Sequence, residues 1–288
     1  MRIRSKIPTS VAAVVVAASV VAAGAPEHRD LLLRLSRVAA LYQDSALDFA
    51  CKEAIAYKGV RSGSIRFSYL FTHGPDGRLH DYRTWPSGTT PAARGEEVDP
   101  RDYHVPRYLE SAYLWAFVFR WDRQPLHAFY DLGDGEVLGR PAVKIGFQPK
   151  GPIETGLNDW IGVAWIDRET SQILEVEAWP PESWNQRAER TSDLESSSSR
   201  KKGWKSREYQ IESIVTEFSV EKNGMRFPGK VTIVHTVSTV VAGDAEFPIH
   251  ERETLRVTQE YSDYEFFAVR SKEEIGRIVS GDEPPPGL

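Results

Sequence analysis

Hydrophobic residues follow two different periods along the chain, and the first of them is helical. Between residues 31 and 49 apolar side chains recur at spacings of three and four, and Arg34 and Arg37 fall outside this stripe. Such a stripe is typical of an amphipathic helix with one face on a core. We therefore expect a helix near the N-terminus. Its buried face should consist of Leu31, Leu35, Val38, Tyr42, Ala46 and Phe49.

From Cys51 onward the period mostly changes to two, which is typical of strands that bury one face. Turn residues separate the alternating segments and predict antiparallel hairpins. We expect turns at 74–77, 133–135 and 223–224, and a long last strand over 249–267. In the third hairpin the apolar residues change from odd to even numbers near Ser213, which predicts a β-bulge that curves the sheet. The strand residues expected on the buried face are Phe67, Tyr69, Val143, Ile145, Phe147, Val231 and Ile233.

Two segments interrupt the strands. Pro106–Phe119 is apolar almost all round and begins with a proline, which is favoured in the first turn of a helix. We expect a buried helix there that covers the sheet, with Tyr113 and Phe117 among its apolar residues. Glu182–Arg207 is polar, charged and rich in serine, and this composition predicts a long exposed loop.

The stretch WIDRETSQILEVEAW, from Trp165 to Trp179, places four carboxylates between two tryptophans. A catalytic pair of carboxylates has to converge across a cleft and usually has one perturbed pKa. Asp167, however, begins a short polar connection between two apolar strands, where its side chain can accept hydrogen bonds from backbone amides. Glu175 and Glu177 alternate with apolar residues, on a strand face that we expect to be solvated. We interpret the stretch as a hairpin rather than as an active site.

The same hairpin carries a resemblance to a known family. WIDRETSQIL, preceded by LGRPAVKIGFQP, resembles a hairpin of the LolA/LolB lipoprotein-carrier superfamily, and an N-terminal helix followed by FACKEAIAY and a meander of long strands is similar to its secreted bacterial members. The resemblance implies an α+β fold in which a strongly curved antiparallel sheet forms a half-barrel and helices cover its concave side. It also implies that the concave surface takes up acyl chains. No functional residue that defines the family matches a position in this sequence.

The first residues are typical of an export signal. Arg2, Arg4 and Lys6 precede the small, apolar run Val11–Ala23, which is shorter than the roughly 20 residues that span a membrane. We expect cleavage near Ala23, no transmembrane segment in the mature chain, and a soluble periplasmic protein. The mature chain is expected to form a single domain over 24–280, followed by a flexible tail over 281–288.

Charge and motifs weigh against several classes of function. The first 23 residues contain three basic and no acidic groups, so the remaining chain has 33 basic and 41 acidic residues and a net charge of −8. This charge disfavours nucleic acid as a partner. The sequence lacks H-E-x-x-H, G-x-S-x-G, P-loop and G-x-G-x-x-G patterns, so we expect no enzyme, no cofactor and no metal site. Cys51, the single cysteine, is interpreted as a buried apolar residue.

The expected function is to carry or bind a lipid or an acylated protein in an apolar cavity. The residues expected to line it are the seven strand residues given above, Tyr113 and Phe117 of the covering helix, and His235, which falls on the same face as Val231 and Ile233. A module that binds a partner protein of the cell envelope is the alternative. A hydrolase whose residues converge only in three dimensions is a third hypothesis.

Overall fold

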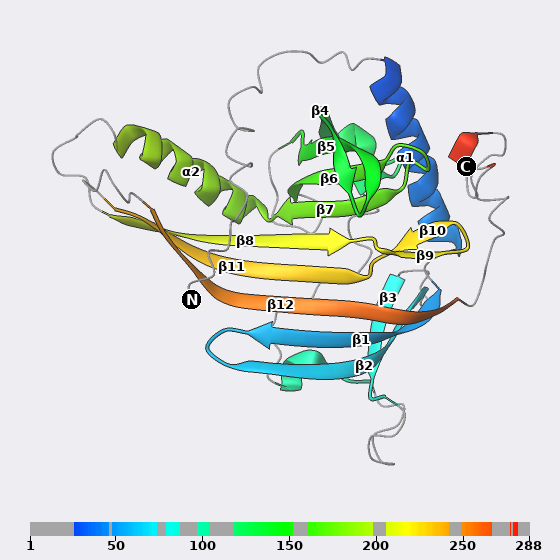
Figure 1. Cartoon of the computed structure of the whole chain (residues 1–288), viewed down its shortest axis with the longest axis horizontal. Coiled ribbons are helices and arrows are strands. Elements are labelled where there is room, and N and C mark those ends of the chain that lie inside the picture. The colour runs from blue at the N-terminus through cyan, green and yellow to red at the C-terminus, as the bar shows by residue number, and fades with distance from the viewer. Residues whose placement is uncertain are drawn as a thin grey trace.

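The computed structural model describes residues 26–45, 48–73, 79–86, 97–103, 118–151, 160–197, 206–241, 249–266, 277 and 279–281. Its main feature is one antiparallel sheet of ten strands, in the order β3-β2-β1-β12-β11-β8-β7-β6-β5-β4. The two end strands, β3 and β4, do not pair with each other, so the sheet is open. The elements are α1 (Pro26–Ser45), β1 (Phe49–Lys58), β2 (Ser62–His73), β3 (Leu79–Thr84), η2 (Pro100–Tyr103), η4 (Gln124–Leu126), β4 (His127–Val137), β5 (Arg140–Pro149), β6 (Ile161–Asp167), β7 (Ile173–Trp179), α2 (Pro181–Ser197), β8 (Arg207–Glu217), β9 (Val220–Lys222), β10 (Met225–Phe227), β11 (Lys230–Val240) and β12 (Ile249–Phe266) (Figure 1).

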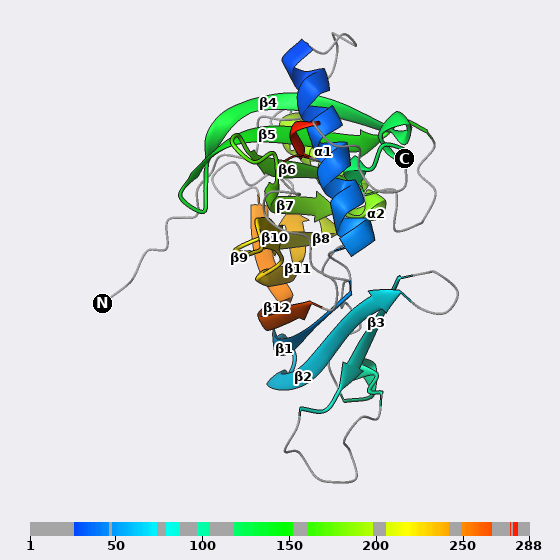
Figure 2. The same cartoon turned by 90° about the vertical axis from the view of Figure 1, so that its right-hand side faces the viewer.

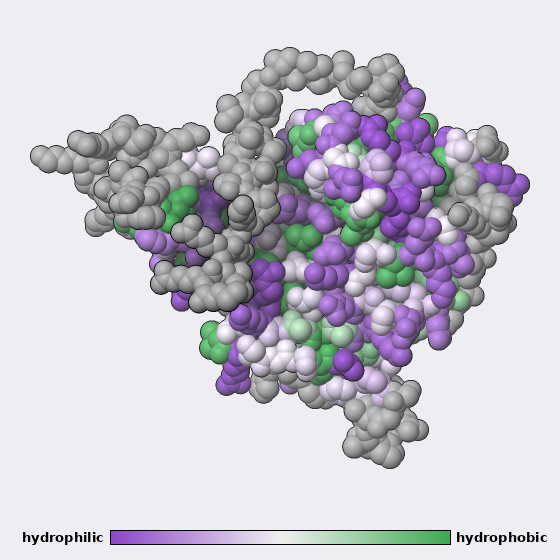
Figure 3. Space-filling model, in the orientation of Figure 1, coloured by the Kyte–Doolittle hydropathy of each residue, from purple (hydrophilic) through white to green (hydrophobic). Residues whose placement is uncertain are grey.

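The sheet is curved, and α1 lies on its concave side. Figure 2 shows the strands following an arc from β4 to β3, with α1 inside the arc. The expected α+β half-barrel is therefore confirmed. The face of the molecule seen in Figure 3 is mostly hydrophilic, with hydrophobic residues in small separate patches. The expected export signal lies outside the described residues, and none of the helices that are described is both long and apolar enough to cross a membrane.

The predicted amphipathic helix is confirmed as α1. Leu31, Leu35, Val38 and Tyr42 are buried and belong to the same hydrophobic cluster as the concave face of the sheet. The helix ends earlier than expected, at Ser45, and Phe49 instead begins β1. A residue three or four places along a stripe can continue the helix or start the next element, and burial alone does not distinguish the two.

The alternation predicted for the first strands is also confirmed. In β1 the buried residues are every second one, and Cys51 packs there as an apolar side chain that is 5% exposed. Burial, with the nearby charge of Glu53, raises the pKa of the Cys51 thiol far above its ordinary range. The equivalent face of β2 carries Phe67, Tyr69 and Phe71, all buried.

The hairpin of β4 and β5 turns later than predicted. The strand β4 continues through 133–135, and the turn lies at Leu138 and Gly139, which have φ angles of 52° and 72°. Gly133 has a φ of 92° within β4, where the pairing with β5 shifts between Asp131 and Asp134. Glycine adopts this conformation without steric cost, so here it marks an irregularity inside a strand rather than the end of one.

The third hairpin divides into two pairings. The predicted turn at 223–224 is present, but it joins β9 and β10, which form a separate small sheet, while β8 pairs with β11. The predicted bulge near Ser213 is wrong, because β8 and β11 stay in continuous register there. The register shift lies between β11 and β12, after His235. The apolar residues change phase because Tyr209 and Ser238 are buried on the other face of these strands, beside α2.

The helix α2 corrects the prediction of a loop over 182–207, since 181–197 are helical. Where β7 ends, α2 takes its place along β8: Ser183 Oγ accepts a hydrogen bond from the amide of Glu212 at 2.9 Å, and Gln186 Oε1 accepts one from the amide of Gln210. Trp184 packs on Trp179 with ring centroids 5.6 Å apart. The helix is held by these contacts and lacks a broad apolar stripe. The other expected helix, at 106–119, lies almost entirely outside the described residues.

Candidate functional site: the concave face and a polar pocket at its end

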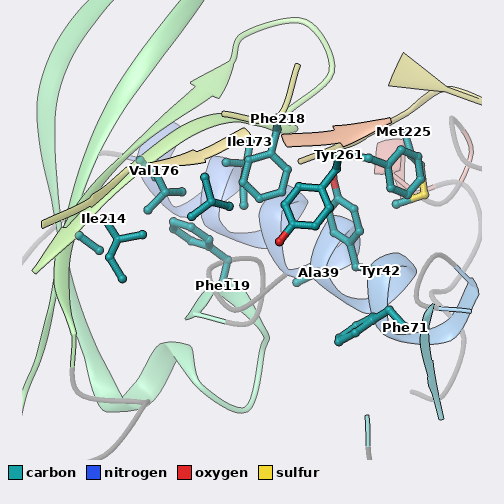
Figure 4. Packing of buried hydrophobic residues seen from close by; sticks show 14 of the residues in the cluster. Ala39, Tyr42, Phe71, Phe119, Ile173, Val176, Ile214, Phe218, Met225 and Tyr261 are labelled. Carbon is teal, nitrogen blue, oxygen red and sulfur yellow. The ribbon is translucent and has the colours of Figure 1, made fainter. Parts of the chain in front are cut away.

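Six of the residues expected to bind an acyl chain lie on the concave face and are at most 1% exposed: Phe67, Tyr69, Ile145, Phe147, Val231 and Ile233. Val143 is partly buried and packs against the same cluster. Figure 4 shows how α1 reaches this face, with Tyr42 and Ala39 among Phe218, Tyr261 and Val176. Tyr113 and Phe117 lie outside the described residues. The concave face is thus largely apolar and, among the described residues, is covered by α1 and by Phe119, which packs on Phe147.

Polar contacts as well as apolar ones hold α1 in place. The hydroxyl of Tyr42 donates to the carbonyl of Arg226, and burial raises the pKa of this hydroxyl. Arg34 Nε donates to Ser171 Oγ at 2.9 Å, at the tip of the β6–β7 hairpin. Gln124 Nε2 donates to the carbonyl of Leu32 at 2.7 Å. These contacts form only while α1 is docked, so each of them favours the closed arrangement.

A buried ion pair lies on the β1–β3 side of the concave face. Arg83 donates from Nε and Nη2 to the two carboxylate oxygens of Glu53, at 2.6 and 3.0 Å, and the hydroxyl of Tyr261 donates to Glu53 Oε1 at 3.0 Å. Burial lowers the pKa of Arg83, but its hydrogen bonds and ion pair with Glu53 outweigh this and raise it overall. Glu53 and Arg83 are 30 residues apart in the sequence, and no local pattern predicts that they form an ion pair. Their charges satisfy each other.

Asp167, the candidate catalytic residue of the WIDRETSQILEVEAW stretch, has a structural role. Its Oδ1 accepts hydrogen bonds from the amides of Glu169 and Thr170, both at 2.9 Å, and its Oδ2 pairs with Arg140. Burial raises the pKa of Asp167, but the hydrogen bonds from Arg140 and the two amides lower it by more, so the net shift is downward. The prediction of a hairpin fixed by this side chain is confirmed.

The tip of this hairpin joins several elements. Besides the bond from Arg34 of α1 to Ser171, the side chain of Gln172 links it to the β9–β10 hairpin. Gln172 Nε2 donates to the carbonyl of Gly224, and its Oε1 accepts from the amide of Arg226, each at 2.7 Å. Ser171 and Gln172 of this hairpin tip therefore connect β6 and β7 to α1 and to the β9–β10 hairpin.

The expectation that Glu175 and Glu177 are solvated is only partly right. Both are partly buried, and burial raises the pKa of each, with further contributions from the neighbouring carboxylates in the case of Glu175. The cause is a layer of long side chains on the outer face, where Lys144 lies over the ring of Trp165 at 4.9 Å and Arg187 over that of Trp179 at 4.7 Å.

A polar pocket of about 390 Å³ lies where α2 meets β8 and β11. Its walls include Glu182, Ser183 and Gln186 of α2, Gln210, Ile211 and Glu212 of β8, His235, Thr236 and Val237 of β11, and Pro180 and Thr254. Glu212 Oε2 lies 3.4 Å from His235 Nε2. Burial, and next the charge of Glu182, raise the pKa of Glu212, whereas burial lowers the pKa of His235. His235 thus lies at the polar end of the face that it was expected to share with Ile233.

The sequence contained only part of the signal for this pocket. Alternation places Glu212 on the same face as Ile214, and His235 on the same face as Ile233. The third wall belongs to α2, which was predicted as a loop, so the pocket was missed. Among the described residues no group of three or more His, Cys, Asp or Glu side chains could hold a metal ion.

No family model matches the sequence, and no curated protein matches it. Solved structures do match, over 83–86% of this chain and 94–97% of theirs. They include a DUF1329 family protein from Desulfovibrio piger (15% identity, TM-score 0.40), a putative outer membrane lipoprotein-sorting protein domain from Vibrio parahaemolyticus (10%, 0.39) and a LolA superfamily protein from Nitrosomonas europaea (10%, 0.36). The function has to be inferred from this chain's own residues.

Proposed function

We propose that the protein is an exported carrier that holds a lipid or acyl chain against the concave face of its half-barrel. The observation that carries this proposal is the nature of that face: it is apolar across several strands, and α1 is a principal cover over it among the described elements. Each methylene group of a ligand that such a face removes from water contributes about 0.8 kcal/mol to the binding free energy. The face needs no specific polar contact to bind a chain.

The buried positions of the expected binding residues define how uptake would work. Because Ile145 and Ile233 are 0% exposed, a chain reaches them only when part of the cover moves away. The movement that we propose is displacement of α1, which would release its hydrogen bonds to Ser171, Arg226 and Gln124. The affinity for a chain is then the intrinsic affinity multiplied by the fraction of molecules in which α1 is open.

The carboxylates of the β6–β7 hairpin tip and of the concave face also favour a binding function over catalysis. Asp167 is held by Arg140 and two amides, and Glu53 is held by Arg83 and Tyr261. A carboxylate whose oxygens are occupied by internal partners is poorly placed to accept a proton from a substrate.

The experiment compares two arginines of α1. Arg34→Ala removes the hydrogen bond to Ser171, whereas Arg29→Ala removes an exposed arginine of the same helix. Loss of one such bond, worth about 1 kcal/mol, raises the open fraction about fivefold. We expect Arg34→Ala to bind a fluorescent fatty acid about fivefold more tightly than the wild type, and Arg29→Ala to bind it equally well. Circular dichroism checks that the sheet is unchanged.

Two results would contradict the carrier. One is a wild type that binds no acyl ligand at any concentration below micelle formation. The other is equal binding by both variants together with unchanged uptake in Ile145→Asp, provided that this variant keeps its circular dichroism spectrum. A charge at that position would make the face unsuitable for a chain.

A second candidate, binding of an envelope protein, is favoured by a different observation. The concave residues are buried, whereas Leu33 of α1 is exposed together with Trp121, Leu126 and Tyr130. The bond from Gln124 to Leu32 places the 121–126 segment beside α1. Native mass spectrometry of protein purified from its own host separates the two: a bound lipid supports the carrier, and a bound polypeptide supports the partner module.

A further inference from the structure

The pocket between α2, β8 and β11 differs from the rest of the concave face because its lining is polar. Its volume of about 390 Å³ is within the range of roughly 300–1,000 Å³ that is usual for small-molecule sites. Its walls are fixed by the bonds from the β8 amides to Ser183 and Gln186. The space is therefore formed before any ligand arrives.

The pocket continues the apolar face along the same two strands. In the continuous register of β8 and β11, Ile214 pairs with Ile233 and Glu212 pairs with His235. Side chains two residues apart share a face of a strand and are about 7 Å apart along it. A ligand whose chain lies over Ile214 and Ile233 would thus place its polar end beside Glu212 and His235.

The charge of the pocket lining determines which ligand head group it favours. The titratable groups that line the pocket are Glu182 from α2, Glu212 from β8 and His235 from β11, and no lysine or arginine is among the lining residues. Burial and, next, the negative charge of Glu182 raise the pKa of Glu212, so the two carboxylates repel each other when both are ionised. Burial lowers the pKa of His235, which favours its neutral imidazole near pH 7. A cation relieves this repulsion, while an anion increases it.

We propose that this pocket binds the ammonium group of an amphiphile whose chain lies on the concave face. The inference rests on the proposed carrier function and adds the chemistry of the head group. Glu212 and Glu182 would provide the negative charge, and neutral His235 would accept a hydrogen bond from the ammonium. An uncharged head gains only neutral hydrogen bonds, which are weaker than bonds between charged partners.

The test uses three ligands with the same chain: dodecylamine, dodecanol and dodecanoate, each below micelle formation, in displacement of a fluorescent acyl probe. We expect the wild type to prefer the amine over the alcohol by about tenfold or more, as a charge-assisted bond in a partly buried site implies. Glu212→Gln keeps the shape of the pocket but removes its negative charge, and it should lose most of this preference for the amine over the alcohol. Glu208→Gln, an exposed residue of the same strand outside the lining, has the same effect on net charge and should behave as the wild type.

The outcomes separate this inference from the carrier function. Equal binding of amine and alcohol by the wild type, or a preference that survives in Glu212→Gln, would overturn the ammonium site and leave the carrier intact. If no chain binds at all, the carrier fails, and methylammonium then tests the pocket alone. Chemical-shift changes at the amides of Gln210 and Glu212 on its addition would support a cation site, and unchanged shifts would overturn it.

Discussion

Two acidic sites, one at the end of β6 and one between α2 and β8, give their carboxylates different surroundings. At the end of β6 and β7 near α1, the oxygens of Asp167 are occupied by Arg140 and two backbone amides, and the pKa of Asp167 is lowered (Figure 1). At the second site, beside α2, Glu212 shares a pocket with Glu182, and its pKa is raised. The hydrogen bonds and the ion pair of Asp167 are all made with groups of the protein itself. Glu212 stabilises the protein less and is better suited to an external cation.

This contrast explains why acidic residues in a sequence are a poor guide to a site. The WIDRETSQILEVEAW stretch contains the conspicuous carboxylates, but Asp167 is fixed by internal partners, and Glu175 and Glu177 lie among long side chains on the outer face. The pocket uses Glu182 and Glu212, which are 30 positions apart in the sequence and have ordinary neighbours. The direction of the pKa shift, together with the cavity, distinguishes the two.

The largest loss of stability is expected where a buried carboxylate loses its ion-pair partner. Arg83→Leu would leave Glu53 buried without its ion pair, and such a loss typically costs about 3–5 kcal/mol. Asp81→Asn is the matched control, because Asp81 also bonds Arg83 but is partly exposed, and we expect it to cost less than about 1 kcal/mol. Urea denaturation measures both. Equal losses would show that enclosure is not what makes these partners important.

A smaller loss is expected at the hairpin tip. Asp167→Asn keeps an oxygen for the amides but removes the ion pair with Arg140, and we expect a loss of about 1–2 kcal/mol. Glu169→Ala, whose side chain is exposed and bonds only the outer part of Arg140, should change stability by less than about 0.5 kcal/mol. Ligand binding by Asp167→Asn should match the wild type below its melting temperature. Lost binding with unchanged stability would mean that the hairpin is a functional site after all.

The two sites should also respond to pH in opposite directions. The folded-state pKa of Asp167 is lowered, so its contribution to stability is present above its ordinary value of 3.8 and is lost as the pH falls through the folded value. The folded-state pKa of Glu212 is raised, so its contribution is fully present below the ordinary value of 4.5 and is lost as the pH rises through the folded value. Thermal melts of Asp167→Asn and Glu212→Gln from pH 3 to pH 8 compare them. If the difference in melting temperature from the wild type changed with pH in the same direction for both variants, the proposed difference between the two sites would be wrong.

The smallest expected effect is an increase in stability. Because the ionised form of Glu212 is disfavoured by burial and by Glu182, Glu212→Gln should stabilise the protein at pH 7, by about 0.5 kcal/mol once solvent screening is allowed for. The gain should vanish below pH 4.5, where the wild-type side chain is itself protonated. A variant that is less stable than the wild type at pH 7 would mean that the contact with His235 outweighs the repulsion.

The sequence by itself determined the features that depend on neighbours along the chain. The stripe of Leu31, Leu35, Val38 and Tyr42 identified α1, alternation identified the strands, and Asp167 at the start of a polar connection identified the hairpin that it fixes. Each of these follows from a local period or from hydrogen bonds spanning two or three residues, which any tertiary arrangement preserves.

Only the tertiary structure decided the features in which distant segments meet. The helix α2 has few apolar residues and is held by backbone amides of β8, so its own composition predicts a loop. The change of phase between Tyr209 and Ile214 arises because Tyr209 is buried on the other face of the strand, beside Ser238, which bonds Arg190 of α2, and alternation cannot distinguish this from a bulge. Glu53 meets Arg83 only after β1, β2 and β3 have paired, and Glu182 meets Glu212 only after α2 has packed on β8. A charge is stabilised or destabilised by the groups that the fold places within a few ångströms of it.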